Sequence, residues 1–132
     1  MENCKKIVDT AAAAMGIVDI LVSNAAYQMK NDISELSEEQ WLHTFDTNIH
    51  PSFYFSKYAL PHMKSGSTII NNASINAYIG RPDLLDYTST KEAIISFTCG
   101  LSKGIRVNTV LLGPPTNSKA IKQPSESPSR PS

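Results

Sequence analysis

Tyr87 and Lys91 are the residues in this sequence best suited to proton transfer. On a helix, residues at this spacing share a face, so a phenol and an ammonium group can approach the same point. A fixed cation stabilises a phenolate and lowers a tyrosine's pKa from its ordinary value of about 10. The pair therefore predicts a tyrosine that gives and takes protons. The spacing is common on surface helices, so the interpretation depends on the residues around it.

Two polar residues upstream accompany the pair. Ser74 follows an apolar run, where a hydroxyl can stabilise charge on a reacting oxygen. Asn48 lies in a segment with a helical pattern. Each also has an ordinary explanation, since strands often end in serine and helical asparagines are usually solvated or capping residues.

The N-terminal segment predicts a helix followed by a buried strand. Gly16 ends the helical pattern, and residues 17–22 form an apolar, β-branched run typical of a parallel strand covered on both faces. Asn24 comes directly after that strand, where open α/β sheets bind ligands. The apolar positions of the predicted helix are Cys4, Ile7, Val8, Ala11 and Met15.

A second helix is predicted to begin at Ser37. Ser37 and Gln40 form a capping box, in which each side chain bonds the other's backbone N–H. Pro51 should bend the continuing helix, because it has no N–H to offer Thr47. The predicted buried stripe is Trp41, Phe45 and Ile49.

The remaining pattern completes an α/β protein. Residues 67–72 predict a strand, a long helix begins at Asp83 or Asp86 and runs to Lys103, and residues 105–112 predict a third strand. Alternating strands and helices call for a parallel sheet with right-handed crossovers. Residues 1–112 are thus expected to form one domain.

These motifs together resemble the short-chain dehydrogenase/reductase family over residues 2 to 116. Several motifs that recur in the family have partial counterparts in this sequence, in the same order. The segments that carry the resemblance are Ser23-Asn24-Ala25-Ala26, Thr47-Asn48-Ile49, Asn72-Ala73-Ser74, Tyr87 to Lys91 and Ile105-Arg106-Val107-Asn108. Around the tyrosine, the sequence looks most like plant glucose and ribitol dehydrogenase homologues and NADPH-dependent aldehyde reductases.

The resemblance implies a catalytic tetrad. Tyr87 would protonate the carbonyl oxygen as hydride arrives from nicotinamide, and Lys91 would activate it and hold the nicotinamide ribose. Ser74 would bond the substrate oxygen, and Asn48 would hold a water that links Lys91 to solvent. Cofactor contacts are expected, besides Tyr87 and Lys91, from Asn24, Ala25, Ala26, Gly113, Pro114 and Thr116. The cofactor would be NADP or NAD, with NADPH favoured.

The sequence also departs from the family pattern. No two glycines before Gly66 are close enough to form the family's glycine-rich turn, whose amides bind the cofactor pyrophosphate. Leu111-Leu112-Gly113 stands where Ala-Pro-Gly is usual. We therefore expect a partial Rossmann-like, doubly wound sheet of about three parallel strands with flanking helices, an apolar edge and weak cofactor binding.

Composition excludes other classes of function. The 12 basic and 12 acidic side chains cancel, so no net field favours nucleic acid or an acidic membrane. Cys4 and Cys99 do not form a disulfide framework, which favours a reducing, cytoplasmic location. His43, His50 and His62 lack cysteines or carboxylates at ligand spacing, so no metal site is predicted. Residues 113–132 are rich in serine and proline and predict a disordered tail.

Two functions remain open at this point. The first is an NAD(P)-dependent oxidoreductase that acts on a small-molecule aldehyde, sugar or polyol, either as a single chain or as a homo-oligomer. The second is a catalytically silent fragment that at most associates with an intact relative, or with a second copy, through its long helices.

Overall fold

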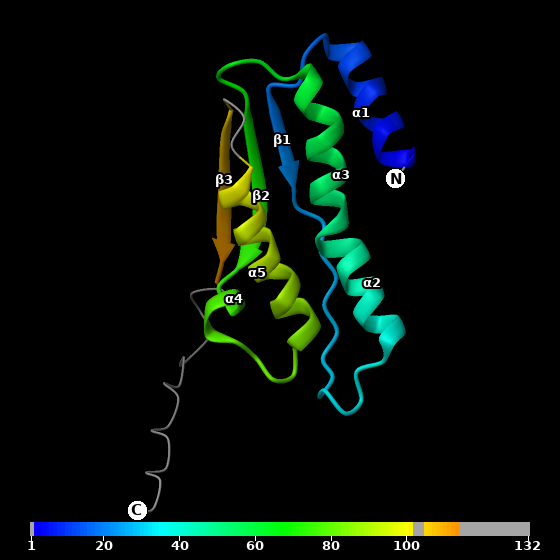
Figure 1. The fold of residues 1–132 in the computed structure, drawn as a ribbon, viewed down its shortest axis with the longest axis vertical. Helices are drawn as coiled ribbons and strands as arrows, with labels where there is room; N and C mark the ends of the chain where they lie inside the picture. Colours follow the sequence, from blue (N-terminus) through cyan, green and yellow to red (C-terminus); the bar gives the residue numbers. More distant parts are fainter. Residues whose placement is uncertain (1, 102–104, 114–132) are drawn as a thin grey trace, which may run out of the picture.

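The computed structural model describes residues 2–101 and 105–113 as an α/β protein (Figure 1). The predicted tail therefore lies, apart from Gly113, outside the described residues. The elements are α1 (Glu2–Met15), β1 (Ile20–Ser23), α2 (Glu38–Asn48), α3 (His50–Ala59), the 3-10 helix η1 (Leu60–His62), β2 (Thr68–Ser74), α4 (Asn76–Ile79), α5 (Leu85–Gly100) and β3 (Arg106–Leu112).

The three strands form one parallel sheet in the order β1-β2-β3. Ile20 lies opposite Thr68, and Thr68 lies opposite Arg106, so all three strands begin at one edge of the sheet. Their carboxyl ends consequently meet at the other edge, where α/β sheets hold their ligands. The predicted partial Rossmann-like fold is confirmed.

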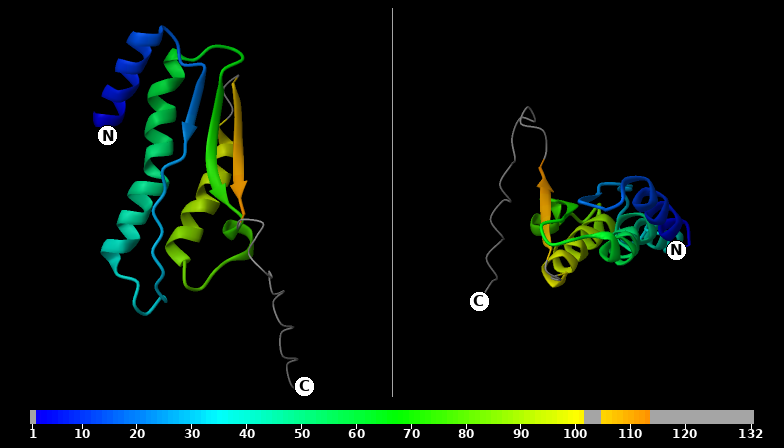
Figure 2. Two further views of the ribbon diagram at one scale, coloured as in Figure 1. Left: turned by 180° about the vertical axis from the view of Figure 1, so that it is seen from behind. Right: turned by 90° about the horizontal axis from the view of Figure 1, so that it is seen from above.

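Helices cover one face of the sheet. Helix α5 lies in front of β2 and β3 in Figure 1 and behind them in the reverse view of Figure 2. On the covered face of β2, Ile69 and Ala73 are buried. Leu21 of β1 packs against a small core that also holds α1 and α3. That core contains Val8, Ala12, Val18 and Ala59.

The opposite face carries exposed apolar side chains. Ile20 and Val22 of β1 are 63% and 57% exposed, and Val110 and Leu112 of β3 are 47% and 54% exposed. We call these four residues the bare face. The prediction that β1 is covered on both faces is wrong, because the described helices pack on one side of the sheet. The predicted apolar edge is confirmed, because β1, with exposed Ile20 and Val22, is an edge strand of the sheet.

Helix α1 occupies the predicted residues but buries a narrower stripe. Val8 is buried, whereas Ile7 and Met15 are 57% and 64% exposed. Among the described residues, its one extensive packing partner is α3, beside which Val8 and Ala12 are buried. Two apolar positions of the predicted helix, Ile7 and Met15, are therefore exposed.

The helix start at Ser37 and the break in the helix near Pro51 are both as predicted from the sequence. The Ser37 side chain accepts the Gln40 N–H at 3.1 Å, which caps the helix. Pro51 interrupts the helical bonding, and α2 and α3 meet at Ile49. The capping box is only half formed, because the Gln40 side chain turns away from Ser37 toward α5.

The buried face of α2 is polar. Gln40, Thr44 and Asn48 are 8%, 0% and 2% exposed. Trp41 and Phe45, predicted to be buried, are only half-buried and stack on each other with centroids 4.8 Å apart. The prediction of the stripe is wrong by one helical position, because polar groups on α5 bond the face that includes Gln40.

Candidate active site

Lys91 is the most deeply buried of the predicted site residues, at 1% exposed. Its Nζ donates a hydrogen bond of 2.8 Å to the Asn72 carbonyl of β2. Lys91 takes part in none of the ion pairs that the described residues (2–101 and 105–113) form with one another. The ammonium is therefore held by a neutral dipole, and no carboxylate cancels its charge.

Burial also changes the acidity of this group. Removal from water disfavours the charged form, and it lowers the pKa of Lys91 from its ordinary value of 10.5. Two interactions offset part of the cost of burying the charge. They are the hydrogen bond to the Asn72 carbonyl and the attraction of the ammonium to the Tyr87 ring. Structural lysines are seldom buried in this way, so the arrangement points to a chemical role.

Tyr87 lies one turn before Lys91 on α5, as the spacing predicted. The Lys91 Nζ is 5.5 Å from the centroid of the Tyr87 ring, and Tyr87 itself is half-buried. The half-buried phenol of Tyr87 can therefore reach a ligand, and the buried Lys91 ammonium lies one turn away on the same face of the helix. The two residues are brought together by helix geometry alone.

Ser74 ends β2 and is 5% exposed. Its Oγ accepts the Asn76 N–H at 3.2 Å, which supports the start of α4. A serine hydroxyl has one hydrogen to donate besides its acceptor sites. Because Oγ accepts this bond, its hydrogen is left for another partner at the carboxyl edge of the sheet.

Asn48 is the last residue of α2, and its side chain is fully engaged. Its Nδ2 donates to the Tyr27 carbonyl at 2.9 Å and to Thr90 Oγ1 at 3.0 Å, and its Oδ1 accepts the Tyr27 N–H at 2.6 Å. Asn48 thus joins α2 to the segment after β1 and to the residue before Lys91. The side chain has no hydrogen left to hold a water.

Three of the predicted cofactor residues, Asn24, Ala25 and Ala26, directly follow β1 at the carboxyl edge of the sheet. Asn24 Oδ1 accepts a hydrogen bond of 2.9 Å from Asn72 Nδ2, while Ala25 and Ala26 are exposed. Gly113 is exposed just after β3. Two further predicted cofactor residues, Pro114 and Thr116, lie outside the described residues.

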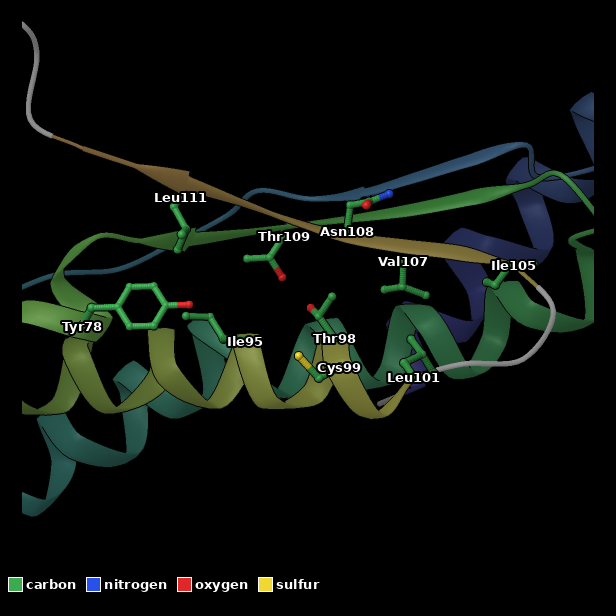
Figure 3. Close-up of a pocket in the computed structure, with 10 residues that line it drawn as sticks. All are labelled: Tyr78, Ile95, Thr98, Cys99, Leu101, Ile105, Val107, Asn108, Thr109 and Leu111. Carbon is green, nitrogen blue, oxygen red and sulfur yellow. The ribbon is translucent and has the colours of Figure 1, made fainter.

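Two hollows flank this edge. A pocket of about 110 Å³ lies between the end of β1 and the α2–α3 break, and Asn24, Ala25 and Asn48 are among its lining residues. A larger hollow of about 530 Å³ lies between α5 and β3, with Tyr78 at one end and Cys99 on the helix (Figure 3). None of the predicted site residues lines the larger hollow.

Sequence reasoning missed several residues that support the site. Asn72 holds Lys91 through its carbonyl and Asn24 through its side chain. Asp86 and Thr90 receive hydrogen bonds from α2. A signal for Asn72 was present, because a polar pair, Asn71 and Asn72, interrupts an otherwise apolar strand. The partners of Asp86 come from a distant helix, which no local pattern identifies.

Comparison with known proteins decides the family. A family model described as short chain dehydrogenase matches residues 1–126. This chain belongs to the short chain dehydrogenase family. The Tyr87 and Lys91 pair lies on α5, which packs against β2 of the parallel sheet.

Individual short-chain dehydrogenases resemble the chain closely. The glucose and ribitol dehydrogenase of Daucus carota is 52% identical over 119 residues, which cover 86% of this chain and 41% of that protein. The chloroplastic NADPH-dependent aldehyde reductase 1 of Arabidopsis thaliana is 50% identical over 119 residues, with the same coverage of 86% and 41%.

A solved structure agrees with the fold. The glucose/ribitol dehydrogenase from Brucella melitensis has a TM-score of 0.80 and 34% identity, over 85% of this chain and 49% of that one. The chain therefore spans less than half the length of the short-chain dehydrogenases it matches.

Proposed function

We propose that the chain carries the proton-transfer half of an NAD(P)-dependent oxidoreductase, which reduces a carbonyl or oxidises an alcohol with Tyr87 as acid or base. One observation carries this proposal. The Lys91 ammonium is buried without a carboxylate among the described residues and lies 5.5 Å from the Tyr87 ring. A cation in that position stabilises negative charge on the phenol oxygen, which a tyrosine needs in order to give up a proton.

Lys91 keeps its position because β2 holds it. The bond to the Asn72 carbonyl uses one of the three ammonium hydrogens and aims the group along the strand end. Two hydrogens remain for a ligand at the carboxyl edge. Lys91 would accordingly orient a ribose hydroxyl while its charge acts on Tyr87.

Ser74 would polarise the substrate. Because its Oγ already accepts the Asn76 N–H, its own hydrogen is available to a carbonyl oxygen that gains negative charge. The proton from Tyr87 Oη then completes the alcohol, and in the reverse direction Tyr87 removes it. Neither step requires a metal ligand from the chain.

Asn48 would act through its backbone. Its two side-chain N–H hydrogens bond Tyr27 and Thr90, so a water at this point would be held by acceptor groups at the helix break. Pro51 offers no N–H to the Thr47 carbonyl, which leaves an acceptor there. This arrangement would let a water link the interior near Lys91 with solvent.

The strand ends fit a nicotinamide cofactor, which supplies or accepts the hydride when bound. Asn72 Oδ1 is buried without a donor among the described residues, beside Asn24, and a sugar hydroxyl could donate to it. Exposed Ala25 and Ala26 leave room for a flat ring. Gly113, Pro114 and Thr116 would contribute from the end of β3.

The relatives favour NADPH and a small aldehyde, sugar or polyol substrate. One relative is named as an NADPH-dependent aldehyde reductase and another as a glucose and ribitol dehydrogenase. The larger hollow beside β3 contains none of the site residues, so we do not assign it to the substrate.

A paired assay tests the proposal. The purified chain is titrated with NADPH and NADH by calorimetry, and NADPH oxidation is then followed with simple aldehydes. Tyr87→Phe should lower kcat by about 10² to 10⁴-fold with folding retained. Tyr78→Phe, at a tyrosine that is 64% exposed, is the matched control and should leave kcat unchanged. Full activity in Tyr87→Phe would refute the proposal.

A second candidate is a catalytically silent chain that associates with an intact relative or with itself. The bare face favours it, because exposed apolar strands pair or associate readily. This candidate would be supported if calorimetry shows no binding heat with either cofactor up to about millimolar concentration. The binding free energy would then be weaker than about −4 kcal/mol. Co-purification with a full-length relative would then identify the association.

A further inference from the structure

We infer that Asp86 is a positioning residue for Tyr87, because its buried carboxylate connects the first turn of α5 to α2. The inference rests on the proposed function of Tyr87. Asp86 is 1% exposed, and it precedes Tyr87 directly in the sequence. A carboxylate is almost never buried this fully unless hydrogen bonds or a cation compensate it.

Three donors converge on the Asp86 carboxylate. Its Oδ1 accepts the Tyr87 N–H at 2.8 Å. Its Oδ2 accepts the Thr44 hydroxyl at 2.6 Å and the Gln40 Nε2 at 3.1 Å, both from α2. The carboxylate therefore bonds the backbone of the proposed catalytic residue with one oxygen and the neighbouring helix with the other.

No cation compensates Asp86 among the described residues, since none of their ion pairs includes it. Its position in the first turn of α5 provides part of the compensation, because the positive end of a helix dipole favours an anion. Helix α5 has no side-chain cap at Leu84. The bond from Asp86 to the Tyr87 N–H therefore satisfies a group that the helix start leaves free.

The network has a fixed direction that an amide cannot reproduce. Gln40 Oε1 accepts the Asn31 Nδ2 at 2.5 Å, so Gln40 Nε2 is the end that faces Asp86. The N–H groups of Tyr87 and Gln40 can only donate to Asp86, and the Thr44 hydroxyl can direct its one hydrogen either to Asp86 or to the Gln40 carbonyl at 2.9 Å. In Asp86→Asn, the amide NH₂ group would point either at the Tyr87 N–H or at the Gln40 NH₂ group, depending on its orientation. Two donors would then face each other, and the hydrogen bond at that position would be lost.

This network holds one end of the proposed catalytic turn and β2 holds the other. Asp86 fixes the backbone of Tyr87 against α2, while the Asn72 carbonyl holds Lys91 one turn later. Thr90, between them, accepts a bond from Asn48. Loss of Asp86 would free the Tyr87 end while Lys91 stays in place, so the phenol would shift relative to the cation and the substrate.

Hydrogen exchange on the full chain tests the contact itself. Asp86→Asn should raise the exchange rate of the Tyr87 amide about tenfold or more, with amides near Thr98 at the far end of α5 unchanged. Asp46→Asn, at an α2 carboxylate that is 67% exposed, is the matched control and should change neither. A uniform rise over α5, or an unchanged Tyr87 amide, would overturn the inference. Thr44→Val is the milder variant and should give a smaller change at the same amide.

The kinetic readout separates positioning from mere stability. In Asp86→Asn, kcat should fall about tenfold to 100-fold, since small misplacements of reacting groups have effects of this size. KM should stay within about threefold, because the cofactor contacts are untouched. An unchanged kcat in an active parent would overturn the inference. If the parent itself shows no turnover, the proposed function fails, and the exchange of the Tyr87 amide alone decides whether Asp86 holds that turn.

Discussion

The two faces of the sheet differ in how their side chains are partnered. On the helix-covered face, Ile69 and Lys91 are almost fully buried, and polar groups such as Asn48 have partners within hydrogen-bond distance. On the bare face, Ile20 and Val22 are more than half exposed. The comparison shows that the buried polar contacts between α2 and α5 lie on the covered face, whereas the bare face leaves apolar side chains available for association.

We expect the largest difference in stability when isoleucine is replaced by alanine on the covered face and on the bare face. Ile69→Ala, at 0% exposure, should lower the free energy of unfolding by about 2 to 5 kcal/mol, because it leaves a cavity against α5. Ile20→Ala, at 63% exposure, should lower it by less than about 1 kcal/mol. Urea unfolding of both variants measures the difference. Equal losses would mean that the bare face is covered in solution.

A second substitution removes a polar connection on the covered face. Asn48→Ala deletes the bonds to the Tyr27 backbone and to Thr90, and it leaves the part-buried N–H and carbonyl of Tyr27 without these partners. We expect a loss of about 2 to 4 kcal/mol in urea unfolding, from lost bonds and desolvated groups. Asn108→Ala, on the exposed side of β3, is the control and should change stability by less than about 0.5 kcal/mol. Similar values for both would contradict the structural role of Asn48.

Burial of Lys91 predicts a pH dependence of stability. Its folded pKa is lowered below the ordinary 10.5, so between the two values the unfolded chain binds more protons than the folded chain. The free energy of unfolding contributed by this group should therefore rise with pH across that interval, by up to about 1.4 kcal/mol for each unit of lowering. Lys91→Met should lack this rise. Chemical denaturation at a series of alkaline pH values checks it, and parallel curves for both proteins would contradict it.

The smallest effect on stability should come from the bare face. Val110→Thr, at 47% exposure, should change the free energy of unfolding by less than about 0.5 kcal/mol. The same variant should reduce concentration-dependent association, measured by light scattering over a dilution series. Association that is unchanged by Val110→Thr would place the self-contact elsewhere on the chain.

Local chemistry in the sequence predicted the elements well. The apolar runs identified all three strands, and Gly16, Ser37 and Pro51 marked the ends and the bend of the helices. The Tyr87 and Lys91 pair was predicted because helical spacing alone brings the two side chains together. These features depend on residues close in sequence, which is why a pattern can identify them.

Features that depend on distant partners were not predicted. The buried face of α2 was placed on Trp41 and Phe45, because an apolar residue is the usual occupant of a helix interface. The interface is instead polar, since Asp86 on α5 needs donors from Gln40 and Thr44. Similarly, an apolar strand pattern cannot tell whether one face or both are covered, so the exposure of Ile20 was missed.

The parallel register has a consequence for the order of folding. β1 pairs with β2, and β2 with β3, only after long crossover segments have closed. Contacts of such sequence separation form slowly, whereas a single helix like α5 forms within about a microsecond. The bond from Lys91 to Asn72 needs both the helix and the strand in place. We therefore expect protection of Lys91 and its neighbours to be among the last steps of refolding, and the apolar strands to be exposed to other chains until then.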